Sequence, residues 1–476
     1  MDLIILIPAV ACWVALARGS ARHALINVYL PAVLLLPQYF ELRFPHLPPL
    51  TFADTAILPL GVALWVKQMR RWRLDWMDLL VVLFAASAAL SEGLSTVLAN
   101  GQWVRLFTAP ADQLQVNLGN GVFQLFAGIT TVVLPYMMGK LLIEHGEIDG
   151  QPVRTVLLRR MAVLLAIVAA ISVFDFVTRM SSWQMAFKHF FSGQPMEWPT
   201  QVRWGFGRIA GPYAHAILAG MVFLMGLMYC IWLRMFAPDW GARKVMKGLP
   251  LTVRGLVLGA IVAGLLMTQS RGPWLGAALS LMFVLLMRAF PVGKATMIFL
   301  VLMAALSVVG YYYGSEYTEM GQGQATSEEQ QSAVYRRDLV HNYMPAVKAR
   351  KAFGWGITTH PAMGEQQSID NEFLMLAVTQ GFTGLGLFMA IVAGSAGRLL
   401  WLAARPLPVA DRGLVFTHLA VLIGLMTALV TVYLGEQALL LFFLIVGWVR
   451  GMNPARAGAG AGAAFAPHFK FRRVLN

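Results

Sequence analysis

Apolar residues recur along the chain in long runs, rather than in the alternating pattern of a strand or the one-sided pattern of a surface helix. A helix needs roughly 20 apolar residues to cross a bilayer. The runs therefore predict an all-α, polytopic integral membrane protein with about 12–14 transmembrane helices. We interpret the following segments as spans: 3–17, 24–40, 52–66, 77–98, 119–141, 161–178, 212–233, 254–270, 274–288, 294–312, 371–396, 413–433 and 436–449.

Composition supports this interpretation. Of the 476 residues, 58% are hydrophobic and 13% are charged, whereas a soluble domain carries about 25% charged residues. We expect one transmembrane domain over residues 1–450, followed by a basic, Ala/Gly-rich tail over 451–476. The two cysteines, Cys12 and Cys230, lie inside apolar runs without disulfide or metal-ligand spacing, so we expect neither a metal nor a cofactor.

The distribution of charge along the chain indicates an orientation. The formal net charge is +14, which in a soluble protein would suggest nucleic acid as a partner. Here 25 of the 37 Lys and Arg residues fall in alternate loops, which the positive-inside rule assigns to the cytoplasm together with the carboxyl-terminal tail. We therefore expect no nucleic-acid partner.

The other cations defy this rule and are better candidates for a specific task. Most lie in two long loops of the opposite face, at about 179–212 and 313–370. In the first, Arg203 and Arg208 precede a span, with Pro212 expected in the first helical turn and His215 one turn inside. Guanidinium groups and a helix amino terminus both attract anions. Anchoring to lipid phosphate is the alternative explanation.

A single arginine occupies the tight turn TQSRG, residues 268–272. Arg271 lies there between two apolar runs with almost no loop. Arginine keeps its charge and binds phosphate in a bidentate manner. An ionisable residue in such a place is costly and marks a functional hypothesis.

The long loop 313–370 contains a helical pattern. Thr326 and Glu329 fit a capping box, and Pro345 is expected to kink or break the helix. Arg336 and Arg337 are candidates for contact with glycan or phosphate, and a solvated helix face is the alternative.

Asp370, Asn371 and Glu372 stand where the chain re-enters the membrane. Carboxylates at a helix start complement the helix dipole, and Asp370 is alternatively a general base that faces the arginines. Other acids near this face could pair with the arginines. They are Asp54, Glu92, Asp175 and Glu436.

The order of these motifs is similar to that of the O-antigen ligase and Wzy-type polymerase superfamily. It runs from GRIAGPYAHAILAG through TQSRG, the Arg pair and FGWG to DNEFL and VTQGFTGLGLF, within residues 160–400. The resemblance implies an α-helical glycosyltransferase of the bacterial inner membrane that works on the periplasmic face. The donor would be a glycan on undecaprenyl pyrophosphate, and catalysis would be metal-independent and inverting. By position, Arg208 and Arg271 would hold the pyrophosphate.

One departure bears on the branch of this superfamily. O-antigen ligases typically carry a His-Asn pair at the re-entry position, where this chain has Asp370-Asn371. That pattern fits better the exopolysaccharide polymerase-like branches, with Asp370 as the base. The resemblance and the residues together predict Asp370, Arg208 and Arg271 as catalytic. The predicted substrate-binding residues are Arg203, His215, Arg336, Arg337, Asn371 and Glu372.

We thus expect a polymerase of surface or exopolysaccharide repeat units. Its partners would be an undecaprenyl-pyrophosphate-linked glycan, an acceptor glycan, membrane lipids and a chain-length regulator. One alternative is an O-antigen ligase that attaches glycan to lipid A-core or protein. Another is a glycan-lipid transporter or flippase, which needs charged residues along a pathway through the whole membrane.

Overall fold

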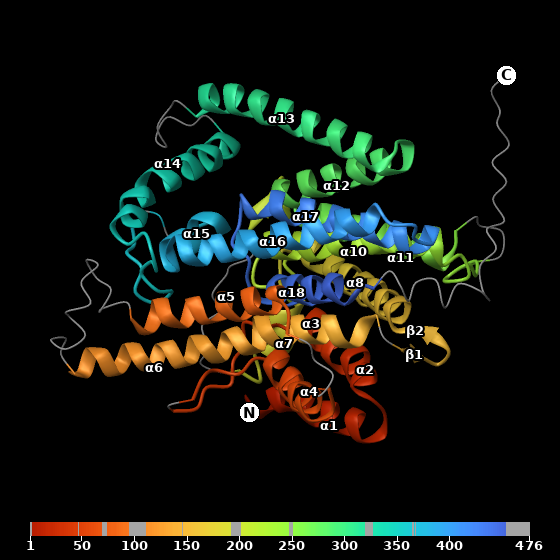
Figure 1. The fold of residues 1–476 in the computed structure, drawn as a ribbon, viewed down its shortest axis with the longest axis horizontal. Helices are drawn as coiled ribbons and strands as arrows, with labels where there is room; N and C mark the ends of the chain where they lie inside the picture. The colour runs from red at the N-terminus through yellow and green to blue at the C-terminus, as the bar shows by residue number, and fades with distance from the viewer. Residues whose placement is uncertain are drawn as a thin grey trace.

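Nearly every element of the protein is a helix (Figure 1). The computed structural model describes residues 2–45, 47–68, 74–94, 111–144, 146–191, 201–246, 251–318, 327–363, 366 and 368–453. Thr326 lies outside this part, and so does the predicted tail beyond residue 453. Within it, strands form only two short antiparallel hairpins, β1 (Glu147–Ile148) with β2 (Gln151–Pro152) and β3 (Val202–Arg203) with β4 (Phe206–Gly207).

The helices follow the apolar runs of the sequence. The first are η1 (Asp2–Leu6), α1 (Ile7–Arg18), α2 (Ala21–Ala24), η2 (Leu25–Tyr29), α3 (Leu30–Leu35), α4 (Phe52–Gln68), α5 (Trp76–Gly93), α6 (Ala111–Gly128), η6 (Ile129–Val133), α7 (Leu134–Met138) and η7 (Gly139–Ile143). Then come α8 (Val153–Thr178), α9 (Ser182–Phe187), α10 (Ala216–Phe236), α11 (Val253–Met267), α12 (Arg271–Ala289) and α13 (Val292–Tyr317). The last are α14 (Glu328–Ala349), α15 (Glu372–Thr379), α16 (Gly381–Ala403), α17 (Val409–Leu429) and α18 (Glu436–Gly451).

The predicted all-α, multi-spanning fold is confirmed. In the described part of the chain, 8 helices are long and apolar enough to cross a membrane. The remaining predicted spans correspond to shorter helices. They are Leu3–Arg18, Ala21–Leu35, Phe52–Val66, Val253–Met267 and Glu436–Gly451.

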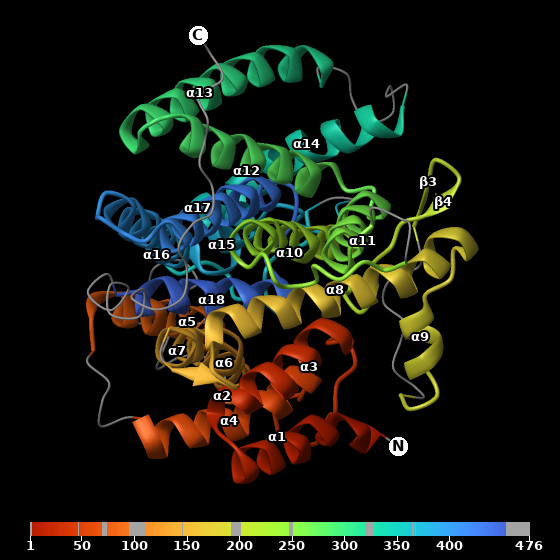
Figure 2. The same cartoon turned by 90° about the vertical axis from the view of Figure 1, so that its right-hand side faces the viewer.

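α10 forms the centre of the bundle. Its side chains are buried over almost the whole length, because α8, α11, α12 and α17 surround it. Figure 2 shows this arrangement in an end view, with α1 and α4 at one edge and α13 at the other. α18 is also buried and packs against α7 and η7.

α13 lies at the edge of the bundle and contacts mainly α12 (Figures 1 and 2). Most of its apolar side chains are exposed, as expected of a helix that faces lipid. After it, α14 packs on α15, where Leu339, Tyr343 and Val378 belong to a hydrophobic cluster separate from the main core.

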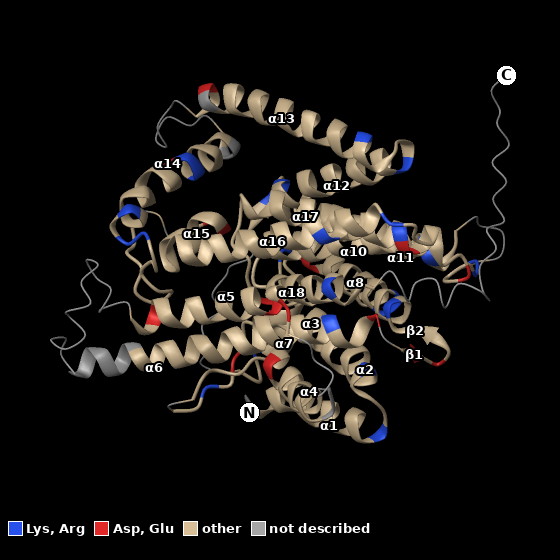
Figure 3. Cartoon of the chain, in the orientation of Figure 1, with Lys and Arg blue, Asp and Glu red and all other residues tan. Residues whose placement is uncertain are grey.

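The charges divide between the two ends of the bundle. Figure 3 shows lysines and arginines gathered at the right-hand end, where α8 and α17 begin, and a smaller set on α14 at the opposite end. Asp75 and Lys140 form one of the ion pairs of the bundle, with Nζ to Oδ2 at 2.9 Å. The other end carries the cations that stood out in the sequence.

The structure corrects four local expectations. The predicted span 371–396 breaks between α15 and α16, where Gly381 has φ +66°. α14 continues through Pro345 without a break, and Ser327 is its amino-terminal cap. α10 begins after Pro212 and His215, not before them, and His215 is its cap.

Candidate functional site

A tight hairpin positions the first arginine. Trp204 and Gly205 form its two-residue turn, with φ of +51° and +80°, the pair of positive angles that a type I′ turn requires. The Phe206 ring stacks on Phe176 of α8, with ring centroids 4.6 Å apart. With the hairpin fixed in this way, the Nη1 of Arg203 donates to the carbonyl of Gln269 at 2.9 Å.

Arg208 contacts the same turn between α11 and α12. Its Nε donates to the Thr268 carbonyl at 3.2 Å and its Nη2 to the Ser270 hydroxyl at 3.0 Å. Its Nη1 donates to the side-chain oxygen of Gln201. The Thr268 carbonyl lies at the negative end of the α11 dipole, which favours a guanidinium.

The arginines keep an uncompensated charge. Among the described residues, neither Arg203, Arg208 nor Arg336 forms an ion pair with a carboxylate. Burial, with the nearby charges of Arg203 and Arg336, lowers the pKa of Arg208 to about 10, against a smaller opposing effect of Asp370. Backbone carbonyls orient the guanidinium without neutralising it, so the site favours an anion.

Arg336 and Arg271 complete the cluster from two other elements. Burial lowers the pKa of Arg336. The nearby charge of Asp370 opposes this shift, and those of Arg203 and Arg271 add to it. Its Nη1 donates to Ser332 at 3.0 Å, and its Nε is buried with no hydrogen-bond partner in the described structure. Arg271 is exposed in the first turn of α12, where the positive end of the helix dipole also favours an anion.

Asp370 is the carboxylate of this cluster. It precedes α15, is half-buried, and its Oδ1 accepts from the Ser368 hydroxyl at 2.9 Å. The next residue, Asn371, caps α15 by accepting from the Leu374 amide at 3.1 Å. Asn371 thus fixes the start of α15, directly after Asp370.

Glu372 connects α15 to the turn between α17 and α18. Its buried carboxylate accepts from the Leu434 amide at 2.6 Å, and its own amide donates to the Val432 carbonyl at 3.1 Å. This anchoring contact explains the residue without a substrate.

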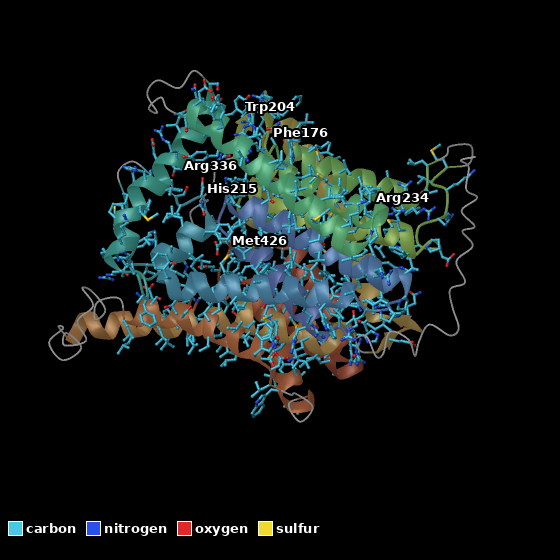
Figure 4. The ribbon with its side chains drawn as sticks, turned by 45° about the horizontal axis from the view of Figure 1, so that its top comes forward. Phe176, Trp204, His215, Arg234, Arg336 and Met426 are labelled. Carbon is cyan, nitrogen blue, oxygen red and sulfur yellow. The ribbon has the colours of Figure 1, made fainter. Side chains whose placement is uncertain are left out.

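His215 caps α10, where its Nδ1 accepts from the Ile217 amide at 3.2 Å. Burial and the charge of Arg208 lower the pKa of His215 to about 4. The ring is therefore neutral at neutral pH and carries its proton on Nε2. In Figure 4, His215 and Arg336 lie toward one end of the molecule, and Arg234 lies at the far end of α10.

The remaining predicted residues lie apart from the cluster. Arg337 is exposed and pairs with Asp338 at 2.7 Å. Three of the four acids considered as partners for the arginines bind hydroxyl groups: Asp54 accepts from Thr51, Glu92 from Thr358 and Asp175 from Ser182. The fourth, Glu436, accepts from the Ala214 amide at 3.3 Å.

The sequence did not reveal the groups that hold the arginines. Ser270 and Gln201 are side-chain partners of Arg208, and the polar triplet before Arg271 was the available signal for Ser270. The contacts to the carbonyls of Thr268 and Gln269 cannot be predicted from the side chains, because any residue has a backbone carbonyl. Gln269 has a φ of +49°, a backbone conformation that is uncommon for glutamine and that the sequence does not predict.

A small pocket opens beside Arg208 and His215. It lies between the ends of α8 and α9 and the segment before α10, with Tyr39, Asp175 and Gln184 also in its wall. Among the described residues, no group of three His, Cys, Asp or Glu side chains is placed to hold a metal ion.

Comparison with known proteins gives a family for part of the chain. The model of the O-antigen ligase family matches residues 255–389, a segment that includes Arg271, Arg336 and Asp370. No curated protein gives a significant match to the chain. The match supports glycan transfer of the ligase or polymerase class by an integral membrane enzyme. Residues 255–389 are therefore similar to the O-antigen ligase family, the resemblance that the motifs of the sequence indicated.

Proposed function

We propose that the protein transfers a glycan from undecaprenyl pyrophosphate to a sugar hydroxyl at the periplasmic face of the bacterial inner membrane. The observation that carries this proposal is the cluster of Arg203, Arg208, Arg271 and Arg336 with one carboxylate, Asp370. A cluster of four arginines at one end of a helical bundle suits the pyrophosphate of a lipid carrier. The family match supports the reaction class.

The residues can be assigned steps in this reaction. The acceptor hydroxyl oxygen attacks the anomeric carbon, and the bond from that carbon to the pyrophosphate oxygen breaks with inversion. Negative charge grows on the leaving pyrophosphate, where Arg208 and Arg271 stabilise it. Fixed donors of this kind are worth on the order of 10²–10³-fold in rate each. Asp370 accepts the proton of the hydroxyl.

Orientation follows from the alternating basic loops. α8 and α17 begin at the end where cations concentrate (Figure 3), which the positive-inside rule assigns to the cytoplasm. The arginine cluster then faces the periplasm. A chain-length regulator is proposed as a partner for the basic cytoplasmic loops, and no metal or cofactor is needed for the steps above.

Within this class we propose polymerisation of surface or exopolysaccharide repeat units. The Asp370-Asn371 pair supports this branch, since ligases typically carry His-Asn at that position. Deletion of the gene in its source bacterium, followed by analysis of carrier-linked and surface glycans, tests the proposal. Accumulation of single lipid-linked units with loss of long chains is the expected result.

Two other outcomes would overturn the polymerase assignment. Long chains that remain on the carrier, with a bare acceptor, would mean a ligase for lipid A-core or protein. Units trapped in the cytoplasmic leaflet would mean a flippase.

A further inference from the structure

Asp175 has a binding capacity that the arginine site does not use. It lies in the last turn of α8 and is only 4% exposed. Its Oδ1 accepts from the amide of Ser182 at 2.8 Å and from the hydroxyl of the same residue. Its Oδ2 is buried with no hydrogen-bond partner in the described part of the chain. A buried carboxylate oxygen without a donor is costly, so a missing partner is indicated.

Asp175 also lines the pocket beside Arg208. Besides Asp175 and Arg208, the polar groups in the wall are neutral hydrogen-bonding side chains. They are Tyr39, Ser181, Gln184, Gln201 and His215. Hydroxyls, amides and an imidazole can donate and accept, which suits a ligand with several hydroxyl groups.

The size of the pocket limits the ligand. Its volume of about 40 Å³ holds roughly three water-sized groups, since one such group needs about 10–15 Å³. This is room for the substituents along one edge of a single sugar ring, and too little for an oligosaccharide.

The charges distinguish a sugar from a phosphate. The carboxylate of Asp175 repels phosphate, whereas a sugar hydroxyl can donate to it. Arg208 lines the same pocket and belongs to the arginine cluster. A ligand that places its pyrophosphate on the cluster can therefore extend the neighbouring group, its first sugar, toward Asp175.

We propose that this pocket is a subsite for the sugar attached directly to the pyrophosphate, with Asp175 accepting hydrogen bonds from its hydroxyls. The proposal rests on the proposed function and adds the group that recognises the donor sugar. Tyr39 supplies a hydroxyl in the same wall.

Binding to the purified full-length protein in nanodiscs tests this subsite. The probes are undecaprenyl pyrophosphate alone and the same carrier with glucose, galactose, N-acetylglucosamine or N-acetylgalactosamine. We expect wild type to bind one sugar-bearing carrier at least tenfold tighter than the bare carrier. Asp175→Asn should lose that preference, by about 10–100-fold for hydrogen bonds to a charged group, and keep its affinity for the bare carrier.

Two further variants make the result decisive. Asp54→Asn removes another buried carboxylate, which accepts from Thr51 and lies outside the pocket, and it should keep the preference. Tyr39→Phe removes only a pocket hydroxyl and should weaken the preference, which decides the matter if Asp175→Asn does not fold.

Two results would overturn the subsite. They are an equal affinity of wild type for all five carriers, and an undiminished preference in Asp175→Asn or, if that variant does not fold, in Tyr39→Phe. Failure of the proposed function looks different, since wild type would then not bind the bare carrier, or Arg208→Ala would bind it as well as wild type.

Discussion

The individual arginines of the cluster differ from ordinary surface arginines in the groups that they contact. Arg203 and Arg208 donate to the carbonyls of Gln269 and Thr268, and Arg336 donates to a serine hydroxyl. These contacts fix direction and leave the positive charge available. Arg337, one residue further along α14, forms an ion pair with Asp338 instead. The contrast gives a matched pair for mutation.

Arg208→Ala should lower glycan transfer on the order of 10²–10³-fold, because one fixed donor to the leaving group is lost. Arg208→Lys should recover little of this loss, because a lysine cannot reproduce the three directed contacts of the guanidinium. The measurement is chain length and yield of surface glycan at matched protein levels. Arg337→Ala serves as the control and should stay near wild type. Equal effects of the two alanine variants would contradict the assignment.

His215 predicts a pH effect on stability. Its pKa is about 4 in the folded protein and about 6.5 in an unfolded chain. Between these values the unfolded state binds the extra proton, so the free energy of unfolding falls as the pH drops from 6.5 to 4. His215→Asn keeps a cap for α10 and removes the titration. Its Tm should fall less over this window, and an unchanged pH dependence would refute the explanation.

Sequence reasoning located the residues of the arginine cluster better than it predicted their contacts. Arg208, Arg271 and Asp370 stood out because they lie at span ends on the face that the orientation rule leaves poor in cations. Arg337 and Glu372 shared that position along the chain. What separates them is the direction of the side chain and the partner across the fold, Asp338 for one and Leu434 for the other.

Among the elements, the break between α15 and α16 is a feature that the apolar pattern did not predict. Residues 371–396 are continuously apolar enough to predict one span. The loop after α14 instead inserts its backbone at the break, where the Phe382 amide donates to Lys351 and the Trp355 amide to Val378. Gly354 and Gly381 allow this approach, since a Cβ at either would lie 2.5 Å from backbone atoms. Such long-range backbone pairing has no periodic signature.

Close helix contact at α18 depends on glycine in the same way. A Cβ on Gly447 would lie 1.9 Å from the Tyr136 carbonyl. Gly447→Ala should therefore push α18 from α7 and lower stability by about 1–3 kcal/mol. Gly259→Ala in α11 is the control, since a Cβ there meets nothing within 4 Å. Thermal unfolding in detergent compares them, and equal Tm values would disprove the packing argument.

At the scale of the whole molecule, the all-α fold could be predicted because lipid as a solvent requires long apolar helices. The convergence of residues 203, 208, 271, 336 and 370 on one end of the bundle also followed, once alternate loops were assigned to opposite sides. The contacts among helices did not follow, because apolar residues face both lipid and core. α10 and α13 are similarly apolar, yet one is central and the other lies at the edge.

An anion that neutralises the cluster should stabilise the whole protein. At a concentration a hundred times its Kd, a ligand of the folded state adds about 2.7 kcal/mol to the free energy of unfolding. Inorganic pyrophosphate should raise the Tm of wild type above that in sodium chloride of equal ionic strength. Arg208→Ala combined with Arg271→Ala should abolish the difference. An equal rise in the double variant would place the anion elsewhere.

Above all, we propose that this protein breaks the bond between a glycan and its pyrophosphate carrier. The most direct measurement uses the purified protein in liposomes with labelled lipid-linked repeat units. We predict that wild type releases undecaprenyl pyrophosphate while the remaining labelled lipids carry longer glycans, and that Arg208→Ala does neither. Movement of intact labelled lipid between leaflets, with no carrier released, would contradict the account and indicate a transporter.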